Sequence, residues 1–311
     1  MELLTRVPIS PSDNPIDYRS KVLILGSCFA EHMGSKLDYY QFQNLCNPFG
    51  IIYQPQAIYE LLRRSLEQDY FTPEELFKLN ERWHCFSVHS DLSHPDKESL
   101  LRDLNQGLDN TATYIRNASH IIITLGTSWV YRYKRTGKLV ANCHKVPQRE
   151  FQKELLTQAV ITGYLDQLKQ LLRKANSRIH LTFTVSPVRH LRDGFTENQR
   201  SKAQLISAVH LLKAVSYFPS YELMMDELRD YRFYTADMVH PNEIAINYIW
   251  ERFKESSIAT DAYPVMEQVM AIRKGMAHRP FNPDSQTHGA FLSSLEQKIT
   301  ALRDSYPFMN F

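Results

Sequence analysis

Three side chains of this 311-residue chain have the types and the order that nucleophilic acyl transfer requires: Ser27, Asp237 and His240. A serine hydroxyl becomes a nucleophile when a neighbouring histidine accepts its proton. Asp237 precedes His240 by three residues within a loop-like segment, so its carboxylate can reach the imidazole Nδ1 and fix the tautomer. We therefore predict a Ser-Asp-His triad, provided that the fold brings Ser27 to the other two residues.

Ser27 follows a short apolar segment, residues 22–25, whose composition is typical of a strand buried on both faces. After it, Phe29, Met33 and Leu37 recur at helical spacing. Ser27 is therefore expected at the carboxyl end of a strand, where open α/β sheets bind ligands and where helix N–H groups can stabilise an oxyanion. The alternative is that Ser27 only caps its helix, because serine is a preferred N-cap.

Other residues compete for these roles. Asp91 and His94 form a second Asp-x-x-His pair, but they follow no clear strand and precede no closing helix, so we discount them. Ser128 also follows a strand through a glycine, and the thiol of Cys28 is a chemically competent nucleophile. Free cysteines are more often buried than reactive, and Cys28 begins an apolar helix face. Ser27 is the preferred nucleophile, with Ser128 and Cys28 as alternatives.

Strand-like and helix-like segments alternate along residues 20–255, which predicts a parallel sheet of about five strands with helices on both faces. The expected strands cover about residues 21–25, 41–46, 120–125, 179–185 and 215–218, and the expected helices cover about 28–40, 55–66, 96–117, 151–175, 198–213 and 244–253. We also expect a helical turn at 74–79, an irregular strand at 82–88, a hairpin over 130–142 and two later helices at 264–275 and 291–302.

The composition excludes several classes of function. A net charge of +2, with 43% hydrophobic and 23% charged residues, is ordinary for a globular protein and does not favour a nucleic-acid partner. Residues 1–14 lack the apolar run of a signal peptide, and no stretch is long enough to span a membrane, so we expect a cytoplasmic protein. The four cysteines, Cys28, Cys46, Cys85 and Cys143, have no metal-binding spacing.

Histidines at residues 84, 89 and 94 are spaced five apart, which separates them on a strand or a helix and does not favour a zinc site. We predict no metal and no diffusible cofactor. Arg189 and His190 follow the expected strand 179–185 and are candidates for a pocket lining, although a surface loop would explain them as well.

Residues 26–30 read Gly-Ser-Cys-Phe-Ala, and this segment resembles the name motif of the GSCFA-domain family. Further segments within residues 20–255 are similar to that family's blocks, among them 47–53, 124–131, 142–147, 184–190, 201–203 and 237–241. The family is similar to the SGNH (GDSL-like) hydrolases, a superfamily of esterases, lipases and carbohydrate deacetylases. The resemblance implies a three-layer α/β/α, flavodoxin-like domain over residues 1–255, with 1–20 as a surface arm, followed by a C-terminal helical extension over 256–311.

The resemblance also implies roles for particular residues. Ser27 takes the place of the nucleophile, and its own N–H and that of Gly50 take the places of oxyanion donors. Ser128 stands where the superfamily has an asparagine, so either its hydroxyl or the side chain of Asn47 would complete the oxyanion hole. The loss of one such donor typically costs about 2.7–4 kcal/mol of transition-state stabilisation.

The expected function is therefore that of an ester hydrolase or acyltransferase acting on an O-acyl substrate, with an O-acetylated carbohydrate as the substrate suggested by the superfamily. We expect the pocket to be lined by Gly126, Trp129, His144, Arg189 and His190. The alternative is a non-catalytic carbohydrate- or ligand-binding module that retains the hydrolase fold. The C-terminal extension is a candidate surface for homo-oligomer formation.

Overall fold

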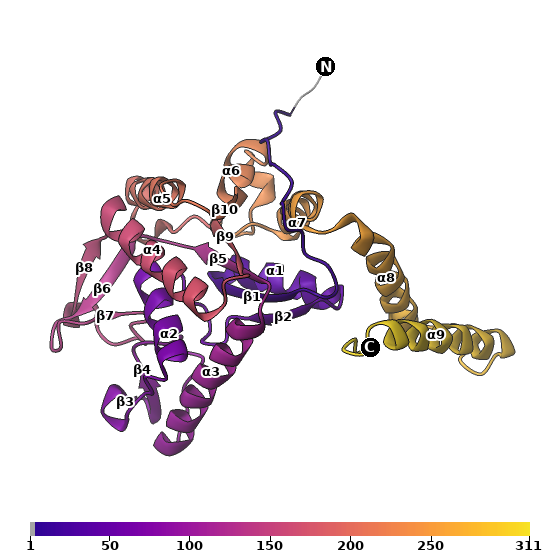
Figure 1. The fold of residues 1–311 in the computed structure, drawn as a ribbon, viewed down its shortest axis with the longest axis horizontal. Helices are drawn as coiled ribbons and strands as arrows, with labels where there is room; N and C mark the ends of the chain where they lie inside the picture. Colours follow the sequence, from indigo (N-terminus) through magenta and orange to yellow (C-terminus); the bar gives the residue numbers. More distant parts are fainter. Residues whose placement is uncertain (1–3) are drawn as a thin grey trace.

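A five-stranded parallel sheet forms the centre of the computed structural model, which describes residues 4–311 (Figure 1). Its strands are β1 (Lys21–Gly26), β2 (Gln43–Cys46), β5 (His120–Leu125), β9 (His180–Val185) and β10 (Ser216–Phe218). They lie in the order β10-β9-β5-β1-β2, and every neighbouring pair is parallel. In chain order this is 2-1-3-4-5, the flavodoxin-like arrangement. The predicted α/β class and the parallel sheet are confirmed.

The central strands form because both of their faces are buried. In β1, Leu23 and Leu25 pack into one hydrophobic core, while Val22 and Ile24 pack into a second core on the opposite face. Successive side chains of a strand point to opposite faces, so a continuous apolar segment is compatible with a strand only when helices cover both sides of the sheet.

Helices supply those two layers (Figure 1). The core that contains Leu23 is completed by α2 (Pro55–Glu67), α3 (Lys97–Asn117), α4 (Gln158–Ala175) and α5 (Phe195–His210). The core that contains Val22 is completed by α1 (Cys28–Tyr39) and α7 (Glu243–Ser257), and it continues into α8 (Tyr263–Ala277) and α9 (Gln286–Ser305). The predicted helices over 55–66, 96–117, 264–275 and 291–302 are thus confirmed.

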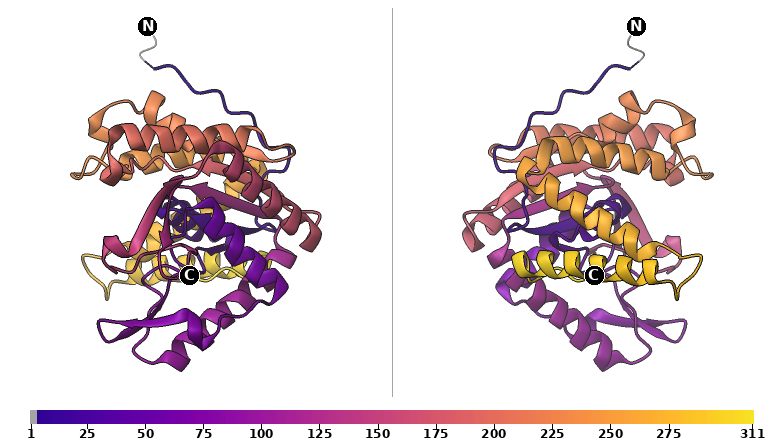
Figure 2. Two further views of the ribbon diagram at one scale, coloured as in Figure 1. Left: turned by 90° about the vertical axis from the view of Figure 1, so that its left-hand side faces the viewer. Right: turned by 90° about the vertical axis from the view of Figure 1, so that its right-hand side faces the viewer.

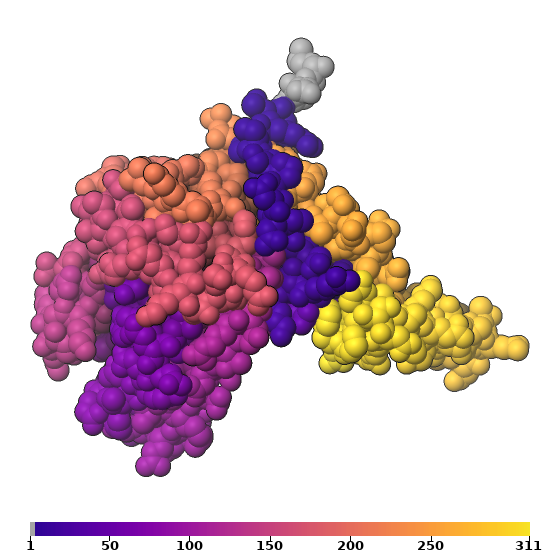
Figure 3. Space-filling view, viewed as in Figure 1, coloured from indigo at the N-terminus to yellow at the C-terminus, as the bar shows by residue number. Residues whose placement is uncertain are grey.

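The last two helices lie to one side of the three layers. Figure 2 shows α8 and α9 behind the sheet in one view and in front of it in the opposite view, and Figure 3 shows them projecting from the body. The N-terminal segment crosses the surface of the body (Figure 3). Further along it, the buried Ile16 pairs with Ile258, which follows α7. Residues 1–3 of the predicted arm lie outside the described residues.

The predicted helical turn over 74–79 is wrong. A 3-10 turn covers only Pro73–Glu75, and β3 (Leu76–Leu79) then pairs antiparallel with β4 (Arg82–Cys85). The connecting residues Asn80 and Glu81 both have positive φ, 49° and 63°, which is the geometry of a tight two-residue hairpin. Sequence reasoning missed this hairpin because neither turn residue is a glycine.

The helix predicted from residue 151 begins too early. Phe151–Leu155 forms β8, which pairs antiparallel with β6 (Trp129–Tyr133), while β7 (Leu139–Val140) pairs with the other edge of β6 as the predicted hairpin. The helix starts after Thr157, whose side chain caps it. The apolar residues near 151–155 fit a helix equally well, and only pairing with a distant strand selects the β conformation.

Short turns complete the chain. They are Gln148–Glu150, Leu191–Asp193, Ser220–Glu222 (α6), Leu223–Glu227, Tyr231–Phe233 and Thr260–Ala262.

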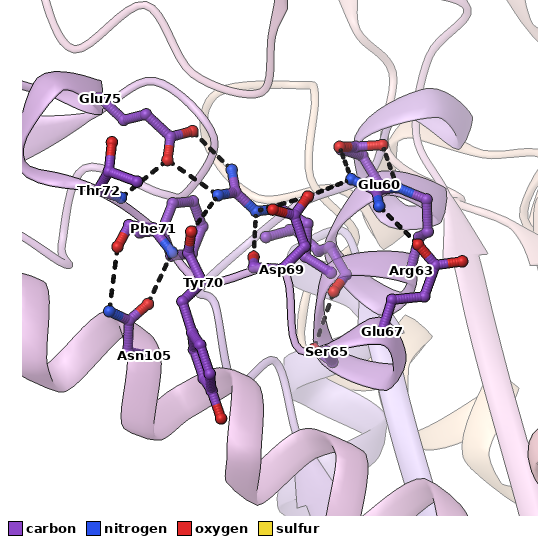
Figure 4. A network of polar contacts seen from close by, with 12 residues as sticks. Glu60, Arg63, Ser65, Glu67, Asp69, Tyr70, Phe71, Thr72, Glu75 and Asn105 are labelled. Atoms are coloured by element: carbon purple, nitrogen blue, oxygen red, sulfur yellow. Dashed lines mark hydrogen bonds and ion pairs between the residues drawn. The ribbon is translucent and has the colours of Figure 1, made fainter.

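A network of charged side chains holds the segment after α2 against α3 (Figure 4). The mostly buried guanidinium of Arg64 contacts Glu75 at 2.6 Å and lies 4.0 Å above the ring of Phe71. Asn105 of α3 accepts the N–H of Phe71 and donates to its carbonyl (Figure 4). Because a buried charge is costly without its partner, this network fixes the path of residues 69–75.

Candidate active site

Ser27 lies at the carboxyl end of β1, at the switch point between β1 and β5, from which the strand order runs in opposite directions. Flavodoxin-like sheets bind their ligands in the crevice at this switch point. Ser27 is the N-cap of α1, and its Oγ accepts the N–H of Phe29 at 3.3 Å. The side chain is only 1% exposed. Within residues 4–311 no group accepts the proton of this hydroxyl, so it remains available to a base.

The backbone before Ser27 requires a glycine. Gly26 has φ of +139°, and a Cβ at this position would lie 2.1 Å from the carbonyl oxygen of Thr124. The N–H of Gly26 donates to Oδ1 of Asn47 at 2.8 Å. This bond orients the Asn47 amide so that its Nδ2 is the remaining polar atom, and Nδ2 is buried without a partner in the described chain. A buried amide N–H without an acceptor is costly and is suited to receive a ligand oxygen.

The other predicted oxyanion donors are already engaged. The N–H of Ser27 donates to the Thr124 carbonyl at 3.2 Å, and the N–H of Gly50 donates to the Asn47 carbonyl at 2.8 Å. The Ser128 hydroxyl donates to the carbonyl of Ser201 at 3.2 Å. Among the four predicted donors, Asn47 is the one whose side-chain N–H groups, on Nδ2, have no acceptor within residues 4–311.

Asp237 and His240 make the contact that their spacing predicts. Oδ2 of Asp237 lies 2.6 Å from Nδ1 of His240, in a turn that precedes α7. Oδ1 of Asp237 accepts the Thr235 hydroxyl at 2.6 Å and the N–H groups of Val239 and His240 at 2.8 and 3.0 Å. The Thr235 hydrogen bond and these others lower the pKa of Asp237 well below its usual range, so the carboxylate is charged.

The turn is fixed to the loop after β9 and reaches toward α1. The N–H of Arg189 donates to the Val239 carbonyl at 3.1 Å. Burial lowers the pKa of His32 in α1, and the nearby charge of His240 lowers it further. The turn that carries the imidazole of His240 therefore lies beside the loop that follows β9, at the carboxyl end of the sheet. Within the described residues the imidazole makes no hydrogen bond to Ser27.

Two buried basic residues lie beside this loop. His190 donates its N–H to Asn198, its ring centre is 5.4 Å from that of Tyr53, and Nε2 has no partner among residues 4–311. Burial lowers the pKa of His190 to about 3, with contributions from the charges of Lys202 and His240.

Lys202 of α5, only 1% exposed, joins the ends of two strands. Its Nζ donates to the carbonyls of Gly126 after β5 and Ser186 after β9, both at 2.8 Å, and burial lowers its pKa to about 7. Sequence reasoning assigned Lys202 no role, although it lies within the block at residues 201–203.

The predicted pocket residues separate into two groups. Gly126 donates its N–H to the Tyr53 carbonyl at 3.0 Å and lies at the same edge of the sheet as Arg189 and His190. Trp129 faces α5, where its indole N–H donates to the carbonyl of Glu197 at 3.1 Å.

His144 lies away from this edge, beneath the β3–β4 hairpin. Its ring centre is 5.1 Å from that of His84, and it packs against Phe77 and Phe86. Both ring nitrogens of His144 are buried without a partner among residues 4–311. The structure therefore does not bring His144 together with Ser27.

The buried imidazole of His144 leads to a pH prediction. Burial, with help from the charge of His84, lowers its pKa to about 4, whereas an unfolded histidine titrates near 6.5. Below pH 6.5 the unfolded chain binds the proton first, so the free energy of unfolding falls as the solution is acidified. Between pH 7.5 and 5 this residue should contribute a loss of about 2 kcal/mol. Urea unfolding of wild type and His144→Leu at both pH values measures it. Equal losses in the two proteins would contradict the prediction.

A cavity of about 560 Å³ lies at the opposite end of the sheet, at the amino ends of β5, β9 and β10. It is lined by residues 8–14 of the N-terminal segment and by histidines 120, 180 and 210. Within residues 4–311, no group of three or more His, Cys, Asp or Glu side chains is arranged to hold a metal ion. A search of the same residues finds no helix with the length and apolarity needed to cross a membrane.

The parallel sheet, with Ser27 at its switch point and the Asp237–His240 pair in the turn before α7, defines a flavodoxin-like α/β protein. The GSCFA family model matches residues 21–253, and the chain belongs to this family. The model of the GSCFA C-terminal domain matches residues 269–311, so the relationship extends beyond the segment recognised from motifs. No curated protein sequence matches the chain.

Proposed function

We propose that this GSCFA-family protein is a serine-dependent ester hydrolase or acyltransferase that acts on an O-acyl substrate, such as an O-acetylated carbohydrate. The observation that carries the proposal is the 2.6 Å contact between Asp237 Oδ2 and His240 Nδ1. This pair lies at the carboxyl end of the sheet, as Ser27 does. A charged carboxylate in this position favours the tautomer whose Nε2 can accept a proton. The resemblance to SGNH hydrolases is the basis for the choice of an O-acyl carbohydrate.

In the proposed mechanism, His240 Nε2 accepts the proton of Ser27 Oγ as Oγ attacks the acyl carbonyl. The negative charge that develops on the carbonyl oxygen is stabilised by Asn47 Nδ2. This buried group has no acceptor of its own among the described residues, and the Oδ1 of the same amide accepts the N–H of Gly26, which precedes Ser27. The imidazolium then protonates the leaving alcohol, and a covalent acyl-serine remains. Water or an acceptor hydroxyl attacks this ester, with His240 again as the base. The Ser27–His240 hydrogen bond forms when the substrate is bound, as is common for catalytic contacts.

Cys28 is a weaker candidate for the nucleophile. Burial raises the pKa of its thiol, and the charge of Glu31 raises it further. Because the thiolate is the reactive form of cysteine, these surroundings keep Cys28 protonated and unreactive. A serine nucleophile does not need a lowered pKa when a histidine base is present.

A non-catalytic binding module is the second candidate. It is favoured by two observations: Ser27 already caps α1 and is 1% exposed, and the N–H groups of Ser27 and Gly50 already have acceptors. In such a module the Nδ2 group of Asn47 would donate a hydrogen bond to an oxygen of the ligand, and no bond of the ligand would be cleaved.

Labelling with a fluorophosphonate probe, followed by peptide mapping, separates the two candidates. An esterase is expected to be modified at Ser27 in the wild type and to lose this modification in His240→Ala, because the base is then missing. Modification of another serine, or labelling of Ser27 that does not depend on His240, would contradict the triad. A folded protein that is not labelled at all would favour the binding module.

A further inference from the structure

A second cavity adjoins the Asp237–His240 turn. It has a volume of about 270 Å³, and its lining includes Arg189, Arg229, Tyr231 and Tyr234. Arg189 also holds the turn itself, since its Nη1 donates to the Met238 carbonyl at 3.0 Å. The cavity is therefore next to the proposed base and is large enough for one sugar-sized group.

Aromatic rings surround the guanidinium of Arg189. Its central carbon lies 5.3 Å from the ring centres of Phe195 and Tyr234 and 5.6 Å from that of Tyr231. Phe195 and Tyr231 are 65% and 64% exposed, so both rings are accessible to a ligand. The rings hold the guanidinium in place through cation–π contacts and leave its charge without a counter-ion.

The charges of the cavity are unbalanced. Neither Arg189 nor Arg229 has a carboxylate within ion-pair distance among residues 4–311. The one carboxylate of the lining, Asp230, is paired with Arg232 at 2.9 Å and also accepts the N–H of that residue. Two unpaired guanidinium groups in one cavity repel each other, and a bound anion would relieve that repulsion.

We propose that this cavity binds a carboxylate or phosphate group carried by a saccharide, with the sugar ring against the exposed aromatic rings. The planar guanidinium groups match the geometry of either anion. If the proposed ester hydrolysis is correct, the bound anion is part of the substrate, and the enzyme selects O-acylated acidic saccharides. This selection of substrates rests on the proposed function. The binding itself does not.

Ligand-observed NMR titration with three probes of similar size tests the binding: methyl glucuronide, glucose 1-phosphate and the neutral methyl glucoside. The wild type is expected to bind at least one anionic probe and to prefer it to the glucoside. Arg229→Gln is expected to weaken this binding about tenfold, because one charge-assisted contact is lost. Arg229 makes no hydrogen bond in the described chain and is exposed, so the variant should fold.

Arg200→Gln is the matched control. Arg200 is exposed on α5 beside the lining residue Gln199 but does not line the cavity, so this variant removes the same charge nearby and should bind as the wild type does. Absence of binding by both anionic probes, equal binding of the glucoside, or equal weakening in both variants would overturn the proposal. Fluorophosphonate labelling of Ser27 in the wild type reports separately on the proposed catalysis, so the two proposals can fail independently.

Discussion

Replacing Ser27 by alanine is expected to abolish fluorophosphonate labelling and to lower kcat for an aryl acetate ester by about 10⁴-fold or more. In the proposed mechanism this substitution removes the atom that forms the acyl-enzyme, so the remaining groups of the site can bind and polarise the ester but cannot form the covalent intermediate. Cys28→Ala, one position further along the same helix turn, is the matched control and should retain both labelling and hydrolysis. Hydrolysis assays of the aryl acetate with the purified variants, stopped or continuous, give kcat for each protein.

The structural cost of this substitution is small and can be measured separately. Ser27 Oγ accepts one N–H at the start of α1, so Ser27→Ala should reduce the free energy of unfolding by about 1 kcal/mol. Urea unfolding therefore distinguishes loss of a nucleophile from loss of the fold. Hydrolysis that persists in Ser27→Ala would contradict the serine mechanism, and hydrolysis lost only in Cys28→Ala would transfer the role to the thiol.

The position of Ser27 was predictable because it depends on local signals. The apolar segment before Ser27 can be buried only as a central strand, and Gly26 permits the turn that follows. The contact between Asp237 and His240 is likewise local, since three residues in a turn bring the two side chains together. What the sequence alone did not determine was the strand order, which places β1 between β2 and β5 and Ser27 at the switch point.

The rest of the candidate site, at the carboxyl end of the sheet, depends on contacts between residues far apart in the chain. Lys202 lies in an ordinary helical segment, and nothing in its neighbours indicates that Nζ reaches the ends of both β5 and β9. The same limit explains the wrong helix at residues 151–155, where pairing with β6 selects a strand. His144 was assigned to the pocket from its motif, but aromatic packing places it beneath the β3–β4 hairpin.

The two predicted alternatives for the oxyanion donor, Asn47 and Ser128, lead to the second large effect. Asn47→Asp is expected to lower kcat by about 10²–10³-fold with little change in binding of the ground-state ester, because the donor acts on the charge of the transition state. Aspartate keeps the oxygen that accepts the N–H of Gly26 and tolerates the positive φ of 43° at this position. The variant therefore removes the free Nδ2 while preserving the turn.

Ser128→Ala provides the comparison. Its hydroxyl donates to the carbonyl of Ser201, so this substitution breaks a buried structural bond and should reduce the free energy of unfolding by about 1–3 kcal/mol. If Asn47 is the donor, Ser128→Ala should lower kcat far less than Asn47→Asp does, once both variants are shown to be folded under assay conditions. The opposite ranking would mean that the Ser128 hydroxyl leaves Ser201 when the substrate binds and stabilises the oxyanion itself. Within the described part of the chain, Asn47 has an unpaired side-chain donor before the substrate arrives and Ser128 does not, and preorganised donors stabilise a transition state without a cost of rearrangement.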